Sequence, residues 1–241
     1  MNTITTELFS PKVDYVLKKI FGSESHLQVL ISFLNGCFEN NIVIESVQIQ
    51  YTEMTKELVE NSFSRLDILA TTNHGEVINI EMQRADEKNM VKRSLYYCSK
   101  VFVAAYYGKN QYQALPRTIC INILDFDLLT KERSYHNVYN LQHNKNHHPL
   151  TYTMELHFIE LPKLTDNDKG LLSRWTAFID DPNSGNAKTP FQIKVTHYKL
   201  QKKREKRKAS LKLNLRGSLK VKLKWCDDDL RKTTQSTSLP I

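Results

Sequence analysis

Residues 65–83, RLDILATTNHGEVINIEMQ, constrain the fold most, because their pattern favours two strands joined by a tight turn. Apolar residues recur along both halves, and the Asn-His-Gly sequence at residues 73–75 consists of turn formers. Strand side chains alternate between two faces, so Glu81 and Gln83 point the same way and Met82 points the other way. The sequence therefore predicts a β-hairpin with polar groups on one face.

The same hairpin predicts a metal site. A turn centred on residues 74–75 sets Asp67 opposite, or one step from, Glu81 and Gln83, whereas a slip of one residue would separate them. Carboxylate oxygens and water suit Mg²⁺ or Mn²⁺ better than zinc, and such an ion activates water against a phosphodiester. The Gln83 amide can orient that water or hold a phosphate oxygen. The alternative is an Asp and a Glu that are merely solvated, which the apolar neighbours of both residues disfavour.

At these residues the chain resembles a known family, the PD-(D/E)XK nuclease family transposases, also called recombination-promoting nucleases. The resemblance covers residues 8 to about 185 and extends the hairpin motif by five further segments in order: SPKVDYVLKKIFG, KRSLYYCSK, LPRTICINILDFDL, MELHFIELPKL and LLSRWTAFIDDPNS. In this family, glutamine takes the place of the lysine that most PD-(D/E)XK enzymes use.

The resemblance implies roles for seven residues. Asp67 and Glu81 would be metal ligands, and Gln83 would replace the lysine. Asp14 and Lys18 lie on the opening helix as part of the catalytic set. Arg93 and Tyr97 lie on the helix after the motif. It also implies that Lys18, Arg93 and Tyr97 contact nucleic acid. The alternatives are an ordinary i,i+4 salt bridge on the first helix, and a long arginine stem beside a core tyrosine on the second.

Periodicity predicts an α/β fold with the order α-β-β-β-α-β around a mixed central sheet, which is the restriction-endonuclease-like core that the resemblance implies. An additional strand pair and a C-terminal helix follow. Capping residues and breakers place the boundaries: we expect helices over 11–21, from 23 or 25 to near Gly36, from Asp86 to about 107 and from Asp166 to about 181, and strands over 44–50, 117–126, 135–141 and 151–160.

The remaining features exclude several protein classes. No apolar run approaches the roughly 20 residues that span a bilayer, and the N-terminus lacks the pattern of a signal peptide. We therefore expect a cytoplasmic protein with no membrane partner. Four cysteines without CxxC spacing predict reduced, packed thiols. The histidines of the loop HNKNHHP are expected to be solvated rather than metal-bound.

Charge divides the chain near the breakers at residues 181–185. Residues 1–187 contain 18 Lys+Arg and 22 Asp+Glu, a net charge of −4, whereas residues 188–241 contain 16 and 4, a net charge of +12. We therefore expect a nuclease-like domain over 1–185 and a basic, poorly ordered tail over 186–241. The tail either binds DNA backbone without sequence preference or is solvated. A shifted reading frame near residue 187 is a further hypothesis, which the coding sequence tests.

Together these features predict a Mg²⁺-dependent endodeoxyribonuclease that acts on DNA in transposition or recombination. One alternative is a catalytically inactive remnant or interaction module that keeps the nuclease fold. A plain basic nucleic-acid binder is the third hypothesis, and the acidic core disfavours it. The oligomeric state stays open, a homo-oligomer included, and so do sequence preference, nicking against double-strand cleavage, and strand transfer.

Overall fold

A computed structural model describes residues 10–38, 43–50, 68–105 and 111–184, together with the backbone of two later strands. The chain divides into two compact units, of which one is Ser10–Thr189. The other contains the two later strands, β7 (Phe191–Thr196) and β8 (Lys220–Trp225), which pair antiparallel. No helix in the described ranges is long and apolar enough to cross a bilayer.

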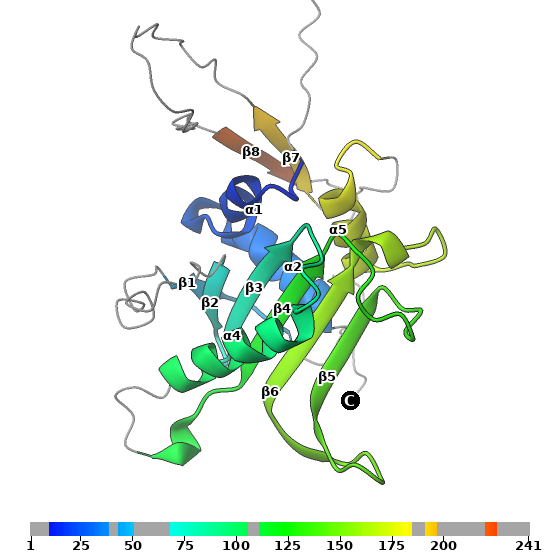
Figure 1. The fold of residues 1–241 in the computed structure, drawn as a ribbon. Helices are drawn as coiled ribbons and strands as arrows, with labels where there is room; N and C mark the ends of the chain where they lie inside the picture. Colours follow the sequence, from blue (N-terminus) through cyan, green and yellow to red (C-terminus); the bar gives the residue numbers. More distant parts are fainter. Residues whose placement is uncertain are drawn as a thin grey trace, which may run out of the picture. The chain divides into compact units, whose positions relative to one another are not determined.

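A six-stranded mixed sheet forms the centre of the first unit (Figure 1). Its strand order is β1-β2-β3-β4-β6-β5, with β3, β4 and β6 parallel and the outer strands antiparallel to their neighbours. The sheet and the helices around it confirm the predicted α/β class. The strands are β1 (Val47–Ile49), β2 (Ile68–Thr72), β3 (Val77–Gln83), β4 (Thr118–Leu124), β5 (His136–Gln142) and β6 (Pro149–Glu160).

The hairpin of β2 and β3 has the predicted alternation. Ile68 pairs with Ile80, and Thr71 pairs with Val77. On the other side of β3, Glu81 pairs with Asn122, so these two residues share one face of the sheet while Met82 lies on the opposite face. All seven residues of β4 are buried, as expected for a strand in the middle of a parallel sheet.

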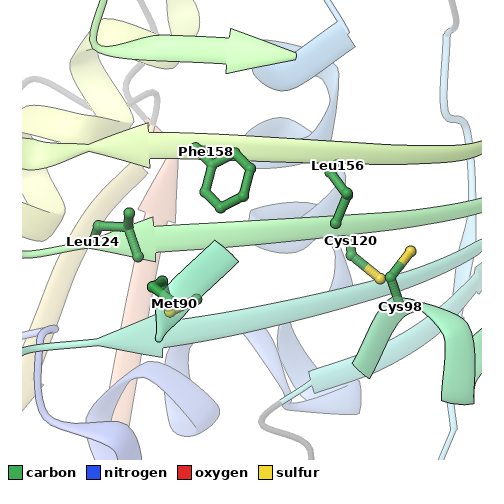
Figure 2. Close-up of a cluster of buried hydrophobic side chains, with 6 residues drawn as sticks. All are labelled: Met90, Cys98, Cys120, Leu124, Leu156 and Phe158. Atoms are coloured by element: carbon green, nitrogen blue, oxygen red, sulfur yellow. The ribbon is translucent and has the colours of Figure 1, made fainter. Parts of the chain in front are cut away.

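Helices cover both faces of the sheet. The long helix α4 (Met90–Ala104) connects β3 to β4 and packs on the face that carries Glu81. There it contributes Met90 and Cys98 to an apolar cluster with residues of β4 and β6 (Figure 2). Helix α2 (Leu27–Phe38) covers the other face of the sheet. Its Phe38 ring lies edge-on to the His157 ring of β6, with 5.6 Å between the ring centroids.

Aromatic packing joins three helices on that second face. The Phe21 ring at the end of α1 (Asp14–Phe21) lies 4.9 Å from Phe33 of α2 and 5.5 Å from Trp175 of α5 (Leu171–Asp180) between centroids. All three rings are fully buried, and the Trp175 indole N–H donates to Ser32 Oγ over 3.2 Å. Short 3-10 turns complete the unit at Glu24–His26, Tyr112–Ala114 and Leu161–Lys163.

Gly36 does not end the second helix as predicted, because α2 continues to Phe38. A Cβ at Gly36 would lie 3.0 Å from the backbone nitrogen of Leu172, so this glycine allows α2 and α5 to approach closely. The tendency of glycine to end helices was the wrong explanation for Gly36, because close packing between two helices also requires a glycine.

Two predicted helix caps were also wrong. Asp86 does not cap α4, since its carboxylate accepts from the backbone N–H of Lys88 over 2.8 Å and the helix begins later, after Asn89. Asp166 does not cap α5, which begins after Gly170 in a left-handed conformation (φ +115°). In both places the aspartate lies in the loop ahead of the helix, and the Asp86 carboxylate binds the Lys88 turn instead.

Candidate functional site

Glu81 lies on β3, near the carboxyl end of the central sheet. Its side chain is 7% exposed, and its Oε1 accepts from the Asn79 amide over 3.4 Å. The two residues meet because they are two apart on one strand and therefore share a face. Burying a carboxylate is costly unless it is hydrogen-bonded or paired with a cation, so Glu81 is a candidate for a functional acid.

Asn79 was missed by the sequence reasoning. Its Oδ1 is buried without a hydrogen-bond partner, which costs about 1–3 kcal/mol for an ordinary polar atom. The alternation that places Glu81 and Gln83 together also includes position 79, so the signal was present in the run NIEMQ. An oxygen atom beside a buried carboxylate, with no donor of its own, is a candidate cation ligand.

Asn122 and Ser94 lie beside Glu81 and fix the helix above the site. Ser94 Oγ lies 3.0 Å from Asn122 Oδ1 and 2.9 Å from the carbonyl oxygen of Met90, and the Asn122 amide donates to the His157 carbonyl over 3.1 Å. Both groups are buried. The first turns of α4 are therefore held over the carboxyl-terminal halves of β3 and β4.

Cys98 lies on α4 one turn after Ser94 and forms a pair of thiols with Cys120 of β4. Cys98 and Cys120 turn toward each other between the helix and β4 (Figure 2). The hydrogen bond to Cys98, together with burial and the nearby Glu81 carboxylate, raises the pKa of the Cys120 thiol well above its ordinary value. This thiol is therefore neutral at physiological pH and packs as a small apolar group. Cys37 is buried and unbridged as well, and Cys226 lies outside the described residues.

Gln83 ends β3 and is partly exposed, on the same face as Glu81. Its carbonyl oxygen accepts from the backbone N–H of Asp125 over 2.9 Å. The Asp125 carboxylate in turn pairs with Lys12, which also pairs with Asp180, each over 2.7 Å. Although burial opposes it, these hydrogen bonds raise the pKa of the Lys12 ammonium. The carboxyl end of the sheet is thus tied to the segment that precedes α1.

The two residue pairs implied by the family resemblance are each in contact. On α1, Lys18 Nζ lies 2.8 Å from Asp14 Oδ1, the i,i+4 salt bridge that was the alternative interpretation. On α4, the Arg93 guanidinium lies 5.6 Å from the centre of the Tyr97 ring and 3.7 Å from a carboxylate oxygen of Glu87. Arg93 directly precedes Ser94, so its helix is the one that covers the Glu81 face.

Asp67 lies outside the described residues, one position before β2 begins. Its predicted contact with Glu81 is therefore not described. Among the residues that the structure does describe, no three His, Cys, Asp or Glu side chains converge in a way that could hold a metal ion.

A second polar network lies on the opposite face of the sheet and was also missed. His136 Nε2 lies 2.9 Å from His157 Nδ1, His157 Nε2 lies 2.6 Å from Glu155, and Arg117 pairs with Glu155 over 2.7 Å. Burial, reinforced by His157, lowers the pKa of His136 to about 4. Because residues two apart on β6 share a face, the run Glu-Leu-His at 155–157 carried the signal.

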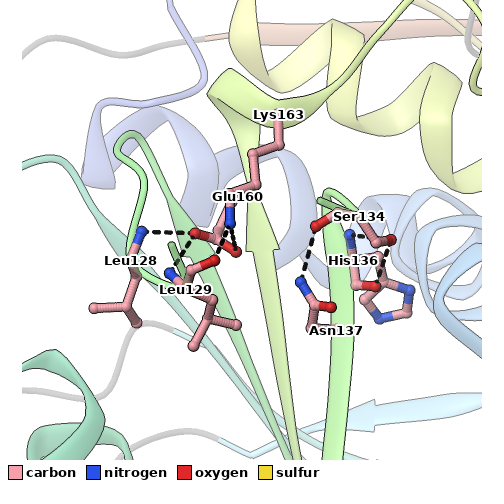
Figure 3. A network of polar contacts seen from close by, with 7 residues as sticks. All are labelled: Leu128, Leu129, Ser134, His136, Asn137, Glu160 and Lys163. Carbon is pink, nitrogen blue, oxygen red and sulfur yellow. Dashed lines mark hydrogen bonds and ion pairs between the residues drawn. The ribbon is translucent and has the colours of Figure 1, made fainter. Parts of the chain in front are cut away.

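Glu160, at the end of β6, has a structural role. This fully buried carboxylate accepts from the backbone N–H groups of Leu128 and Leu129 and pairs with Lys163 over 2.8 Å (Figure 3). The fold holds each of these described partners in place, and together they compensate the negative charge of the buried Glu160 carboxylate. It anchors the loop that follows β4.

Comparison with known proteins agrees with this arrangement. Residues 11–216 match the model of the PD-(D/E)XK nuclease family transposase, a match that extends beyond the boundary predicted at residue 185. No curated protein and no solved structure matches the chain. The match spans most of the sequence, and the six-stranded mixed sheet with its surrounding helices is consistent with a PD-(D/E)XK nuclease fold. The chain therefore belongs to the PD-(D/E)XK nuclease family transposases.

Proposed function

We propose that this protein is a divalent-metal-dependent DNA endonuclease that acts in transposition or recombination. The observation that carries the proposal is Glu81, a buried carboxylate beside an unsatisfied amide oxygen on the central strand of a chain from a nuclease family. The working domain is residues 1–185, and the basic tail adds non-specific attraction to the phosphate backbone.

The donor set around Glu81 fits a hard cation. The hairpin register pairs Ile68 with Ile80, and its continuation by one residue would pair Asp67 with Glu81. Two carboxylates and the Asn79 Oδ1 atom would then offer oxygen ligands on one face, as Mg²⁺ or Mn²⁺ prefers. When bound, such a cation supplies an activated water and polarises the scissile phosphate.

The protein's own side chains would position the reactants. Gln83, at the exposed end of β3, has both amide donors and an acceptor to hold a phosphate oxygen or orient water. Lys18 and Arg93 would offset the negative charge that develops on the phosphoryl group. Each already contacts an acid, Asp14 or Glu87, so these cations would exchange one anionic partner for another.

The surface of α4 supports DNA as the substrate. Met90–Ala104 contains three cations, Lys92, Arg93 and Lys100, and no acidic residue. Two of these cations lie over tyrosine rings: Arg93 over Tyr97 at 5.6 Å, and Lys100 over Tyr96 at 5.3 Å. Cations held on aromatic faces are well suited to a phosphate backbone with exposed bases nearby.

Cleavage of supercoiled plasmid tests the proposal. The parent protein should nick plasmid DNA with Mg²⁺ or Mn²⁺, and Asp67→Ala or Glu81→Ala should lower the rate by at least 100-fold while the melting temperature stays near that of the parent. Glu132→Ala, at an exposed acid elsewhere on the unit, is the matched control. Equal cleavage by the parent and both site variants would refute the assignment of these carboxylates.

Calorimetric titration with Mn²⁺ separates this function from the inactive alternative. An active site should take up Mn²⁺ in the parent and lose that uptake in Glu81→Ala. A remnant that keeps only the fold would show no uptake dependent on Glu81 and no divalent-dependent cleavage of supercoiled, linear or branched DNA.

A further inference from the structure

The β5–β6 ribbon, defined here as residues 136–154, extends beyond the central sheet (Figure 1). Although β6 begins at Pro149, its pairing with β4 begins only at Met154. The first part of β6 therefore pairs with β5 alone. Every residue from 141 to 150 is exposed. Residues 141–153 of the ribbon therefore form a two-stranded arm with an exposed tip, whereas residues 136–140 pair with the part of β6 that also pairs with β4.

The arm is an ordered structure. Leu141 pairs with Thr151 and Gln142 with Pro149, after register shifts that start at Asn140 and sharpen the twist. At the tip, the His143 backbone N–H donates to the His148 carbonyl over 2.9 Å, and the His147 N–H donates to the His143 carbonyl over 3.0 Å. A defined tip backbone fixes the positions from which its side chains start, as a recognition element requires.

The composition of the ribbon differs from that of the rest of the domain. It contains no Asp or Glu and one Lys, Lys145, whereas residues 1–187 as a whole carry a net charge of −4. Amide side chains are concentrated here. Exposed apolar side chains lie beside them, with Leu150 79% and Tyr152 60% exposed. The amides are Asn137, Asn140, Gln142, Asn144 and Asn146.

We propose that the β5–β6 ribbon lies in the major groove of duplex DNA and reads base edges there. The inference rests on the proposed nuclease function and names the part that selects its target. A two-stranded ribbon fits the major groove, amides pair with adenine edges, and apolar side chains contact thymine methyl groups. The absence of carboxylates from the ribbon removes repulsion by phosphates, and Lys145 at the tip adds attraction.

The sheet fixes where this contact lies relative to the candidate site. Glu81 is level with Asn122, which is level with Phe158 of β6. Leu150 lies eight residues before Phe158 on the same strand, and at about 3.3 Å per residue this is at most about 26 Å, because the register shifts at residues 140–142 shorten the arm. That length corresponds to about eight base pairs at about 3.4 Å each. The ribbon would therefore read sequence within about eight base pairs of the scissile phosphate.

Fluorescence anisotropy with the full chain in EDTA measures this binding without cleavage. The probe is a labelled duplex chosen by repeated selection from random 30-base-pair DNA. Lys145→Glu should weaken binding about tenfold and lower the dependence of log affinity on log salt by about one. Asn144→Ala should reduce the preference for the selected duplex over a scrambled one by about tenfold.

Matched controls separate the ribbon from general charge. Lys131→Glu makes the same charge change at an exposed residue of the loop after β4, at the opposite end of the strands, and should bind like the parent apart from a small uniform loss. Leu150→Ala should weaken the selected duplex more than the scrambled one. All four positions are exposed, so the melting temperatures should match that of the parent.

Two results from binding and sedimentation would overturn the inference, and a third would come from cleavage. One is a Lys145→Glu, Asn144→Ala and Leu150→Ala series that binds both duplexes like the parent. The other is a Leu150→Ala protein that changes only from dimer to monomer in sedimentation, which would assign the arm to contact between copies. If ribbon variants lose binding but the parent never cleaves, the nuclease proposal fails alone. If the parent is an active nuclease and the ribbon variants cleave at the same positions and at the same rates as the parent, the ribbon inference fails alone.

Discussion

The Ser94 hydroxyl of α4 lies 3.0 Å from the Oδ1 atom of Asn122 on β4, inside the buried boundary between helix and sheet. Replacement by alanine leaves the Asn122 oxygen without this donor, so Ser94→Ala should lower the free energy of unfolding by about 1–2 kcal/mol. Urea unfolding followed by circular dichroism measures the change. Ser99→Ala, on the exposed side of the same helix, should stay within about 0.5 kcal/mol of the parent.

Gly36→Ala should destabilise the protein although alanine favours helices. The propensity gain is about 1 kcal/mol. The new Cβ, however, would lie 3.0 Å from the Leu172 backbone nitrogen and 3.1 Å from its Cα, and neither atom can move as a flexible side chain would. Overpacking of this kind typically costs about 1–3 kcal/mol. A thermal melt should show a loss, while Gln28→Ala on the same helix should not; a stabilised Gly36→Ala would show that α5 can move away.

His136 should make stability depend on pH. Its pKa in the folded state is about 4, below the ordinary 6.5, because burial and His157 disfavour the charged ring. Below pH 6.5 the unfolded chain binds a proton that the folded chain resists, so the contribution of His136 to stability falls as the pH decreases and is fully lost below about pH 4. Unfolding free energies at pH 7 and pH 5 should differ by up to about 2 kcal/mol from this group.

The histidine variant identifies the source of that pH dependence. His136→Gln should reduce the difference between pH 7 and pH 5, whereas His148→Gln, at the exposed ribbon tip, should leave it unchanged. If both variants keep the full pH dependence, the cause lies in another group.

Glu160→Ala should be among the most damaging single changes. It would leave the ammonium of Lys163 and the backbone N–H groups of Leu128 and Leu129 without the carboxylate that they share. Removing one member of a buried pair typically costs about 3–5 kcal/mol. Chemical unfolding measures the loss, with exposed Glu132→Ala as the control, and a loss below about 1 kcal/mol would contradict the anchoring role.

Gln83→Leu should lower the plasmid nicking rate by about 100-fold, because the proposed phosphate or water contact needs an amide. Met82→Leu is the control, since Met82 lies on the opposite face of the same strand. Single-turnover rates at saturating Mg²⁺ measure the effect. An unchanged rate in Gln83→Leu would remove this residue from the site without affecting Glu81.

The sequence predicted the parts of the fold that depend on local periodicity. The β2–β3 hairpin, the buried strand β4 and the strand pair β5 and β6 could be located because alternation and continuous apolar runs are local signals. Gly36 and Asp86 could not be interpreted in the same way. The role of Gly36 depends on its contact with the α5 backbone, and the role of Asp86 depends on the turn at Lys88. Residue preferences at helix ends contain neither kind of information.

The candidate site was predicted in part for the same reason. Strand alternation places Glu81 and Gln83 on one face, and the same rule would have found Asn79. The Ser94–Asn122 contact spans 28 positions of sequence, and no local pattern indicates which helix residue faces which strand residue. The pairing of Asp67 with Glu81 stays a prediction.

The parallel pairing of the core delays its folding relative to synthesis. Val77 pairs with Thr118, 41 positions later, and Thr118 pairs with Met154, a further 36 positions along. After β3 has been synthesised, more than a third of the domain must therefore still be added before both β4 and β6 exist. Until then, an apolar edge is open to other nascent chains, and such non-local pairing folds slowly. The topology that assembles the site thus also leaves a strand edge exposed while the chain is being made.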